Sequence, residues 1–246
     1  MDVLCHPEAL LNTRKGQALL TDPAFRNNVV AMVIDECHII QKWGEEFRTA
    51  FKKLGNLKVF SPDIPFVASS GTLTKDQKQP IPKQLCLQNF ITIEATPDKP
   101  NTFLEKEKKQ ANMDVLSEYE HIIYQVCDEL NQQRELYPVT LLFIPIFYMS
   151  EALRYLNSIF GVHNIYNSIY SALCTGQDCE VINETIADLK KDNPRIRLVL
   201  TTSISGMGFD PSNVTQVIHT CPPRDLSQYF QEVGRAGRRG QRAVMG

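Results

Sequence analysis

The chain has 246 residues, of which 43% are hydrophobic and 22% are charged, and its formal net charge is −2 at pH 7. This composition is typical of a folded chain with one large or two modest cores. It excludes a disordered chain and a nucleic-acid binder that is basic over its whole surface. No apolar run approaches the roughly 20 residues of a membrane span, and the first six residues lack the basic and apolar regions of a secretory signal.

Seven cysteines, an odd number without CxxC spacing, favour reduced thiols and an intracellular protein. Cys174 and Cys179 form the closest pair, and two further ligands at metal spacing are missing beside them. We therefore expect no zinc site.

Apolar runs alternate with helical patterns, which predicts an α/β fold of parallel sheets with crossover helices. The predicted strands are 29–34, 65–69, 90–94, 139–144, 196–201 and 214–219. The predicted helices are 7–12, 45–54, 117–135, 150–159, 179–191 and 225–235. Prolines and charges of alternating sign in 95–110 predict a solvated connector, and we place a domain boundary after residue 99.

The segment 29–38 is an apolar run that ends in Asp35 and Glu36 and is followed by His38. Such a run predicts a buried parallel strand that brings carboxylates to its carboxyl end, where sheets of this class bind ligands. One or two carboxylates with phosphate oxygens suit Mg²⁺. Two acids that cap a following helix are the structural alternative.

Trp43, the only tryptophan, begins a stretch that continues to Phe47 and Arg48. An exposed tryptophan would stack on the bases of a single strand without sequence preference. A half-buried tryptophan of the core is the alternative, because tryptophan is highly buried on average. Further along, the predicted strand 65–69 is followed by the hydroxyl side chains of Ser70 and Thr72.

Two segments near the carboxyl terminus combine glycines with polar side chains. The strand 196–201 is followed by hydroxyls and glycines, whose donors suit a nucleic-acid backbone. Arg235 and Arg238 lie among glycines at the end of the predicted helix 225–235. The planar guanidinium binds phosphate bidentately, and a spacing of three places both on one side if the turn stays helical. A solvated basic helix end is the alternative.

In their order and spacing, these segments resemble the motifs of RecQ-type ATP-dependent DNA helicases of the DExH superfamily. The resemblance is strongest at 31–72 and 195–240. It is weak at 139–180, where Tyr170–Leu173 lacks the histidine and glycine of relatives. It implies two RecA-like parallel-sheet domains in tandem, 1–99 and 100–246, of which the first is incomplete at its amino terminus.

The resemblance also implies roles for individual residues. It implies that Asp35 holds Mg²⁺, that Glu36 activates the attacking water, and that His38 relays the nucleotide state through Ser70 and Thr72. It assigns the γ-phosphate to Arg235 and Arg238, and further nucleotide contacts to Gly208, Asp210 and Gln231. The implied nucleic-acid contacts are Pro7, Glu8, Trp43, Phe47, Arg48, Thr202, Ser205 and Gly206.

None of the 12 glycines belongs to a Gly-x-x-x-x-Gly-Lys-Ser/Thr loop, which cradles the β- and γ-phosphates of ATP. We therefore expect either part of a longer helicase or a degenerate paralogue, without ATP hydrolysis by the chain alone.

The resemblance implies a 3′–5′ helicase that uses ATP and Mg²⁺, separates the strands of DNA, prefers single-stranded or forked DNA, and acts in the nucleus in DNA repair and recombination. The alternatives are a non-catalytic binding paralogue, and a chain whose first half does not fold because the strand before the phosphate loop is missing.

Overall fold

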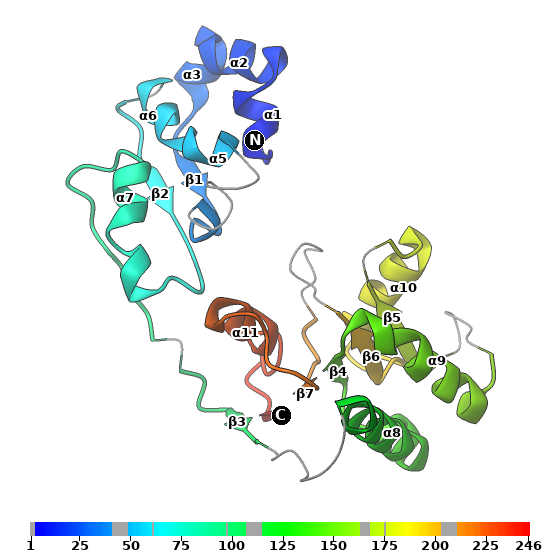
Figure 1. Cartoon of the computed structure of the whole chain (residues 1–246). Coiled ribbons are helices and arrows are strands. Elements are labelled where there is room, and N and C mark those ends of the chain that lie inside the picture. The colour runs from blue at the N-terminus through cyan, green and yellow to red at the C-terminus, as the bar shows by residue number, and fades with distance from the viewer. Residues whose placement is uncertain are drawn as a thin grey trace. The chain divides into compact units, whose positions relative to one another are not determined.

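The computed structural model describes residues 3–40, 49–60, 62–96, 98–106, 115–162, 168–174, 176–202 and 211–246. Contacts divide the chain into two compact units, residues 1–97 and 98–246, which we call the amino-terminal and carboxyl-terminal units (Figure 1). Composition and charge pattern predict the division two residues later, after residue 99. The described helices include none that is long and apolar enough to cross a membrane.

The amino-terminal unit consists of short helices and two parallel strands. Its α-helices are α1 (Pro7–Leu11), α2 (Arg14–Thr21), α3 (Pro23–Asn28), α5 (Thr49–Lys52), α6 (Leu57–Phe60) and α7 (Pro80–Gln84). The described residues of this unit also form two 3-10 turns, η1 (Leu54–Asn56) and η2 (Lys75–Gln77), and the strands β1 (Met32–Ile34) and β2 (Phe66–Ala68). Helices α2 and α3 were not predicted, although the side chains of Thr13 and Asp22 cap their first turns.

Strands β1 and β2 pair in parallel, with Met32 opposite Phe66 and Ile34 opposite Ala68. One face of this pair packs on a core of buried side chains: Leu11, Leu20, Ile34, Cys37, Ile40, Leu54, Leu57, Ile81 and Leu85. The other face carries the paired residues Val33 and Val67, which are 64% and 46% exposed. The amino-terminal unit thus has a core of its own and one sheet face open to solvent.

The carboxyl-terminal unit is built on a six-stranded parallel sheet in the order β3-β8-β7-β4-β6-β5. Its strands are β3 (Thr102–Leu104), β4 (Thr140–Phe143), β5 (Tyr170–Leu173), β6 (Leu198–Thr201), β7 (Gln216–His219) and β8 (Ala243–Met245). Its helices are α8 (Val115–Gln133), α9 (Ile146–Phe160), α10 (Cys179–Leu189) and α11 (Leu226–Val233), with a 3-10 turn η3 (Arg134–Leu136).

Helices cover both faces of this sheet. This is seen at the central strand β4, whose successive residues pack in two different cores. Leu141 packs with Leu189 of α10 and Val233 of α11. Leu142 packs instead with side chains of α8 and α9. All four residues of β4 are buried, as expected of a strand that is covered on both faces. The predicted α/β fold with parallel sheets is confirmed.

Four predictions about elements are wrong. The strand predicted in 29–38 is not buried, because Val33 of β1 is 64% exposed. Residues 90–94 form no strand, and the side chains of Ile91 and Ile93 are 88% and 93% exposed. The predicted connector contains β3, which pairs with β8 and joins the sheet of the carboxyl-terminal unit. The predicted helix 225–235 ends at Val233, so Arg235 lies beyond it.

Candidate functional site

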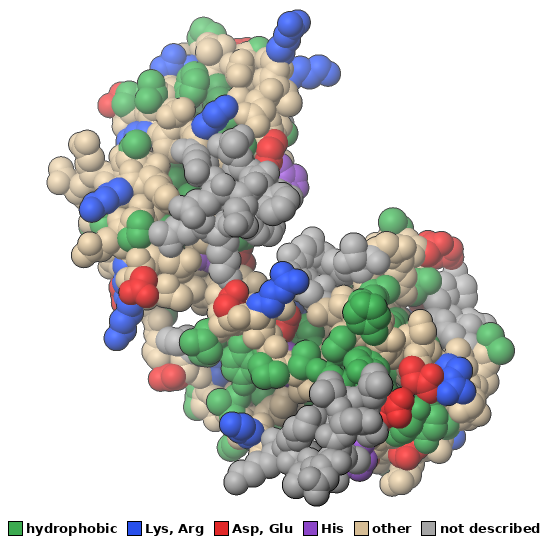
Figure 2. Space-filling model, in the orientation of Figure 1, with side chains coloured by type: hydrophobic (Ala, Val, Ile, Leu, Met, Phe, Trp, Pro, Cys, Tyr) green, Lys and Arg blue, Asp and Glu red, His purple; other side chains and the backbone are tan. Residues whose placement is uncertain are grey.

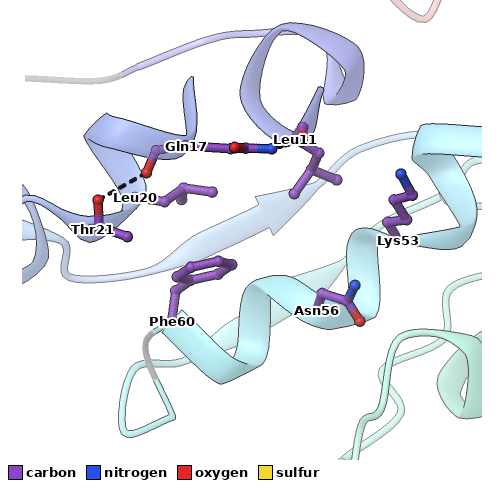
Figure 3. A pocket seen from close by; sticks show the side chains of 7 residues that line it. All are labelled: Leu11, Gln17, Leu20, Thr21, Lys53, Asn56 and Phe60. Atoms are coloured by element: carbon purple, nitrogen blue, oxygen red, sulfur yellow. Dashed lines mark hydrogen bonds between the residues drawn. The ribbon is translucent and has the colours of Figure 1, made fainter. Parts of the chain in front are cut away.

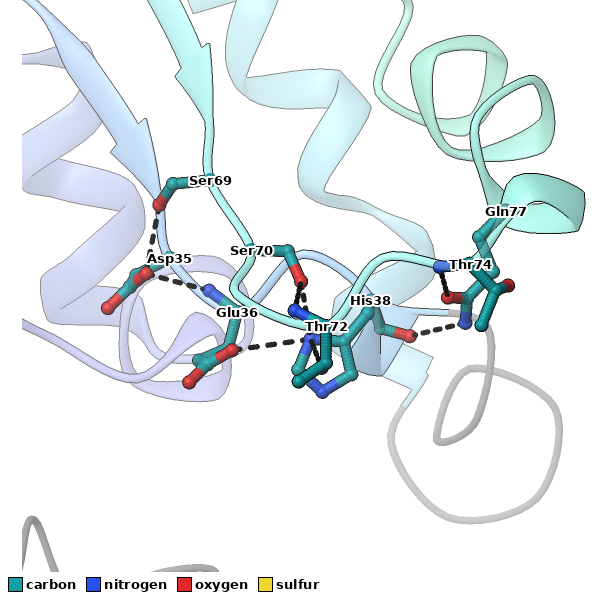
Figure 4. Close-up of polar contacts among 8 residues, drawn as sticks. All are labelled: Asp35, Glu36, His38, Ser69, Ser70, Thr72, Thr74 and Gln77. Atoms are coloured by element: carbon teal, nitrogen blue, oxygen red, sulfur yellow. Dashed lines mark hydrogen bonds and ion pairs between the residues drawn. The ribbon is translucent and has the colours of Figure 1, made fainter. Parts of the chain in front are cut away.

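The carboxyl ends of β1 and β2 bring together the predicted acids and hydroxyls of the amino-terminal unit (Figure 4). The parallel ladder continues past both strands, because Ser69 N donates to Ile34 O and Cys37 N donates to Ser69 O, each at 2.9 Å. The Ser69 hydroxyl also donates to Oδ1 of Asp35 at 2.9 Å. These bonds hold Asp35 in an exposed position at the end of the sheet.

Glu36 adopts a left-handed backbone conformation, with a φ of 51°. A residue with a side chain is strained there by roughly 1–2 kcal/mol, and such strain is typical of functional positions. The turn leaves the Glu36 side chain 48% exposed, and its Oε2 lies 3.3 Å from Nδ1 of His38. Asp35 and Glu36 therefore both present carboxylates to solvent.

His38 is almost completely buried, at 2% exposure, behind these carboxylates. Its Nδ1 lies 2.8 Å from Oγ of Ser70 and 3.5 Å from Oγ1 of Thr72. The structure thus brings together His38, Ser70 and Thr72, which the resemblance implies to be the relay and its hydroxyl partners. A single histidine nitrogen connects the loop after β1 with the loop after β2 and with the Glu36 carboxylate.

Asp35 fits the ligand set of Mg²⁺ in one respect that the structure can test. Both hydrogen bonds that its carboxylate accepts from described residues reach Oδ1, one from Glu36 N and one from Ser69. Oδ2 accepts no hydrogen bond from a described residue, and Asp35 is exposed, so this oxygen can bind a cation or its water. No cluster of three metal-ligating side chains occurs in the part of the chain that the structure describes. Mg²⁺ takes few carboxylates and draws other ligands from phosphate and water.

Ser69 and Gln77 belong to this network although the sequence did not single them out. Gln77 Nε2 donates to the carbonyl of His38 at 3.5 Å, and its Oε1 accepts from Thr74 N at 3.0 Å. The signal for Ser69 was present in the sequence, since it ends the predicted strand 65–69 beside the acids of a parallel neighbour. Gln77 carried no such signal.

Elsewhere in the amino-terminal unit, Pro7 and Glu8 form the first turn of α1 and are half-buried. A cavity of about 420 Å³ opens beside α1 and α2 (Figure 3). Its lining combines apolar and polar side chains: Leu11, Gln17, Leu20, Thr21, Lys53, Asn56 and Phe60. None of the predicted site residues lines it.

The predicted arginines of the carboxyl-terminal unit lie in the segment 234–240, which we call the arginine turn. Gly234 is the C-cap of α11, and Arg235 N and Ala236 N donate to Glu232 O and Val233 O in a tighter turn. Gly237 then takes a φ of 66°. Arg238 is exposed, and its Nε donates to Gly234 O at 3.2 Å. Gln231 is half-buried in the last turn of α11.

A buried pair holds α11 against the sheet. His219 Nε2 and Glu232 Oε2 lie 2.8 Å apart, with side-chain exposures of 6% and 3%. Gln228 donates to the other Glu232 oxygen at 2.8 Å. The His219 ring also stacks on Phe143 at the end of β4, with ring centroids 4.7 Å apart. These residues tie the helix before the arginine turn to the carboxyl ends of β4 and β7.

Thr202 follows β6 and is half-buried at the carboxyl end of the sheet. The remaining predicted contacts lie outside the described residues: Trp43, Phe47, Arg48, Ser205, Gly206, Gly208 and Asp210. On the face shown in Figure 2, basic and acidic side chains are interspersed over each unit, and hydrophobic side chains gather on the carboxyl-terminal unit.

The chain is similar to helicases in sequence. Residues 124–240 match the helicase conserved C-terminal domain. An ATP-dependent DNA helicase RecQ of Haemophilus influenzae is 30% identical over 86% of this chain and 31% of its own length. The bifunctional 3′–5′ exonuclease/ATP-dependent helicase WRN of Mus musculus is 28% identical over 86% of this chain and 14% of its own. A protein of Acanthamoeba polyphaga mimivirus, named as an ATP-dependent RNA helicase, is 30% identical over 86% of this chain and 35% of its own length.

Solved structures share the fold at lower identity. The DEAD-box helicase Mss116 bound to ssRNA and UDP-BeF matches with a TM-score of 0.67 and 15% identity, over 97% of this chain and 46% of that one. The helicase Lhr of Mycobacterium smegmatis bound to ssDNA and AMP-PNP matches with a TM-score of 0.59 and 21% identity, over 97% of this chain and 31% of that one. The chain spans about a third or less of the length of its sequence relatives. The sequence similarity to the helicase C-terminal domain and to RecQ and WRN supports a RecQ-type helicase, of which the chain is part of the core, and the solved structures show the same fold.

Proposed function

We propose that this chain is part of an ATP-dependent 3′–5′ DNA helicase, in which hydrolysis of ATP drives the separation of DNA strands. The observation that supports this most is the arrangement after β1 and β2. The exposed Glu36 carboxylate is joined through buried His38 to Ser70 and Thr72, and the exposed Asp35 carboxylate beside it accepts from Ser69. A network of this kind can report the state of a nucleotide to the neighbouring loop, because each member bonds only a few partners in fixed geometry.

In this proposal the residues divide the chemistry of phosphoryl transfer. Asp35 holds the hydrated Mg²⁺, which neutralises phosphate charge when bound. Glu36 orients the attacking water and accepts its proton, with its carboxylate steered by His38. Arg235 and Arg238 of the arginine turn stabilise the charge that develops on the transferred phosphoryl group, and Gln231, Gly208 and Asp210 contact the nucleotide.

The nucleic acid is proposed to be DNA, single-stranded or forked, bound through its backbone and by stacking. The proposed contacts are Pro7, Glu8, Trp43, Phe47, Arg48, Thr202, Ser205 and Gly206. Relatives named as DNA helicases and one named as an RNA helicase both match this chain, so RNA is the competing ligand to be tested. A nuclear role in repair and recombination belongs to the same proposal.

The central test is ATP hydrolysis with and without a phosphate loop. The 246 residues contain no Gly-x-x-x-x-Gly-Lys-Ser/Thr loop, so we expect no DNA-stimulated turnover by this chain. A fusion to the segment of a RecQ relative that runs from its adenine motif through its phosphate loop should hydrolyse ATP. Glu36→Gln should abolish that activity, and Arg238→Ala should lower it by about 10³-fold while nucleotide binding changes less.

The alternative is a binding protein without catalysis. A fusion that folds and binds DNA but shows no hydrolysis sensitive to Glu36→Gln would favour it. Stimulated hydrolysis by the 246-residue chain itself would instead mean that another phosphate-binding loop exists.

Binding of nucleic acid is tested separately by salt dependence. We expect weak, sequence-independent binding whose log K falls by about 0.7 per unit of log salt for each phosphate neutralised on a single strand. Trp43→Ala should weaken binding and leave this slope unchanged, because stacking releases no counterions. Affinity that ignores salt, or tighter binding to RNA than to DNA of the same sequence, would contradict the proposed ligand.

A further inference from the structure

The arginine turn is held by two side chains from the segment that connects the two units in the sequence. Lys99 Nζ donates to the carbonyls of Gly234 and Ala236, at 2.9 and 3.3 Å. Asn101 Nδ2 donates to the carbonyls of Gly237 and Gln241, at 2.9 and 2.7 Å. We call Lys99 and Asn101 the clasp. Its donors reach four carbonyls in or just beyond the arginine turn.

The clasp supplies what this turn requires on physical grounds. The last carbonyls of a helix have no partners within the helix, and they carry the negative end of its dipole. The Lys99 amine donates to the carbonyl of Gly234, the residue that caps α11, and its positive charge complements the negative end of the helix dipole. Asn101 uses both hydrogens of its amide on the carbonyls on either side of the chain reversal after Gly237, so its side chain fixes the width of that reversal.

The clasp is itself firmly attached to the sheet. The carbonyl of Asn101 accepts from Ala243 N at 2.8 Å, and the next residues form β3, which pairs with β8. The Arg242 guanidinium lies 4.7 Å from the centroid of the Phe103 ring. The position of the arginine turn relative to the sheet is therefore defined through residues 99–104.

Lys99 and Arg238 share an acceptor, since both donate to Gly234 O. Burial, and then the positive charge of Arg238, lower the pKa of the Lys99 amine. Two cations placed side by side repel each other until an anion lies between or in front of them. This arrangement suits a group that binds phosphate oxygens.

We propose that Lys99 and Asn101 are positioning residues for Arg238, and that Lys99 adds positive charge beside it. The inference rests on the proposed function, because it assigns the held geometry to the arginine that stabilises phosphoryl transfer. It extends that function to the connecting segment, which has no role in the motifs described above.

Hydrogen–deuterium exchange of the 246-residue chain tests the clasp without any activity. Asn101→Ala should raise the exchange rate of amides in 237–243 by about tenfold, since the two hydrogen bonds that hold the chain reversal are lost. Asn157→Ala is the matched control, because it removes a hydrogen bond to Tyr170 at the far end of α9. Unchanged exchange in Asn101→Ala would overturn the inference.

Kinetics of the ATPase fusion test the consequence for catalysis. Asn101→Asp keeps the size of the side chain but turns a carboxylate toward two carbonyls, and we expect kcat to fall by about 10²-fold with little change in KM for ATP. Asn157→Ala should leave kcat unchanged. Adding Asn101→Asp to Arg238→Ala should lower kcat little further, because both changes remove the same interaction.

Substitutions of Lys99 test whether a conservative replacement restores kcat. Lys99→Met should lower kcat, whereas Lys99→Arg should restore it, since a guanidinium supplies parallel donors and the charge. Faster exchange with unchanged kcat would overturn the positioning role. A parent fusion without hydrolysis sensitive to Glu36→Gln would overturn the proposed function and the catalytic role of the clasp, while exchange still decides whether the clasp holds the turn.

Discussion

Glu36 in the amino-terminal unit and Gly237 in the carboxyl-terminal unit have positive φ angles of 51° and 66°, each beside charged residues to which a role is proposed. Glycine adopts this conformation without strain, and other residues do so at a cost of roughly 1–2 kcal/mol. At Gly237 the space is also restricted, because a Cβ would lie 2.6 Å from Nδ2 of Asn101 and 3.2 Å from Cβ of Ala243. Both the left-handed backbone conformation of the arginine turn and the close approach of Asn101 therefore require glycine at position 237.

Gly237→Ala should destabilise the carboxyl-terminal unit more than Gly240→Ala. Gly240 has a φ of 81° and open space around its Cα, so an alanine there meets only the backbone cost. At Gly237 the clash with Asn101 adds an overpacking cost of about 1–3 kcal/mol. Urea unfolding of the two variants measures the difference in the free energy of unfolding. Equal losses would mean that Asn101 moves aside freely and would weaken the case for the clasp.

Individual residues of the site differed in how far sequence could place them. The resemblance to RecQ-type helicases implied that Ser70 and Thr72 contact His38. The structure has both hydroxyls beside its Nδ1, where the parallel neighbours β1 and β2 end at the same edge of the sheet. Asn101 was assigned to a solvated connector instead. Its partners lie 136 and 140 residues away in sequence, and no local pattern records a contact of that range.

At the scale of elements, α11 depends on a polar contact as well as on its apolar face. Val233 and Tyr229 pack on the core, while Glu232 is buried against His219 on β7. Buried acids are stabilising only when their partners remain in place. The pair thus fixes the orientation of the helix from which the arginine turn extends.

Glu232→Ala should destabilise the carboxyl-terminal unit by about 3 kcal/mol, because His219 and Gln228 both lose a buried partner. Glu135→Ala, at an exposed position of η3, should stay within about 0.5 kcal/mol of the parent. Chemical denaturation of both variants measures these changes. A loss for Glu232→Ala no larger than for Glu135→Ala would show that the pair contributes nothing to the position of α11.

Long helices were predicted better than short strands. The apolar stripe of 117–135 places Ile123, Val126 and Leu130 in the core, as α8 does. Strands β3 and β8 have three residues each and show no periodicity that a sequence could reveal. Conversely, 90–94 has the composition of a strand but pairs with no described segment, because pairing depends on a partner rather than on propensity.

At the scale of the whole molecule, the two units differ in the size of their cores. The amino-terminal unit has a two-stranded sheet with one face open, and the carboxyl-terminal unit has a six-stranded sheet covered on both faces. Stability from apolar burial scales with buried area. We therefore expect the amino-terminal unit to unfold first.

Two buried cysteines report on the units separately. Burial raises the pKa of Cys127 in α8 to about 12. Burial, followed by the charges of Glu36 and Asp35, raises the pKa of Cys37. Both thiols should resist alkylation in the native protein, whereas the exposed Cys179 should react. With rising urea, Cys37 should become reactive before Cys127. Identical midpoints would show that the chain unfolds as one cooperative unit.

The sequence by itself determined the class of fold and the identity of the charged and hydroxyl residues. Alternating apolar runs predict parallel sheets, and an apolar run that ends in acids predicts where the carboxylates lie. Only the tertiary structure decided how these residues are held, through Ser69 on Asp35, His219 on Glu232, and the clasp on the arginine turn. The reason is physical. Hydrophobic period is a local property of the chain, whereas a hydrogen bond to a backbone carbonyl far along the sequence depends on the packing of the whole unit and leaves no side-chain pattern at the accepting residue.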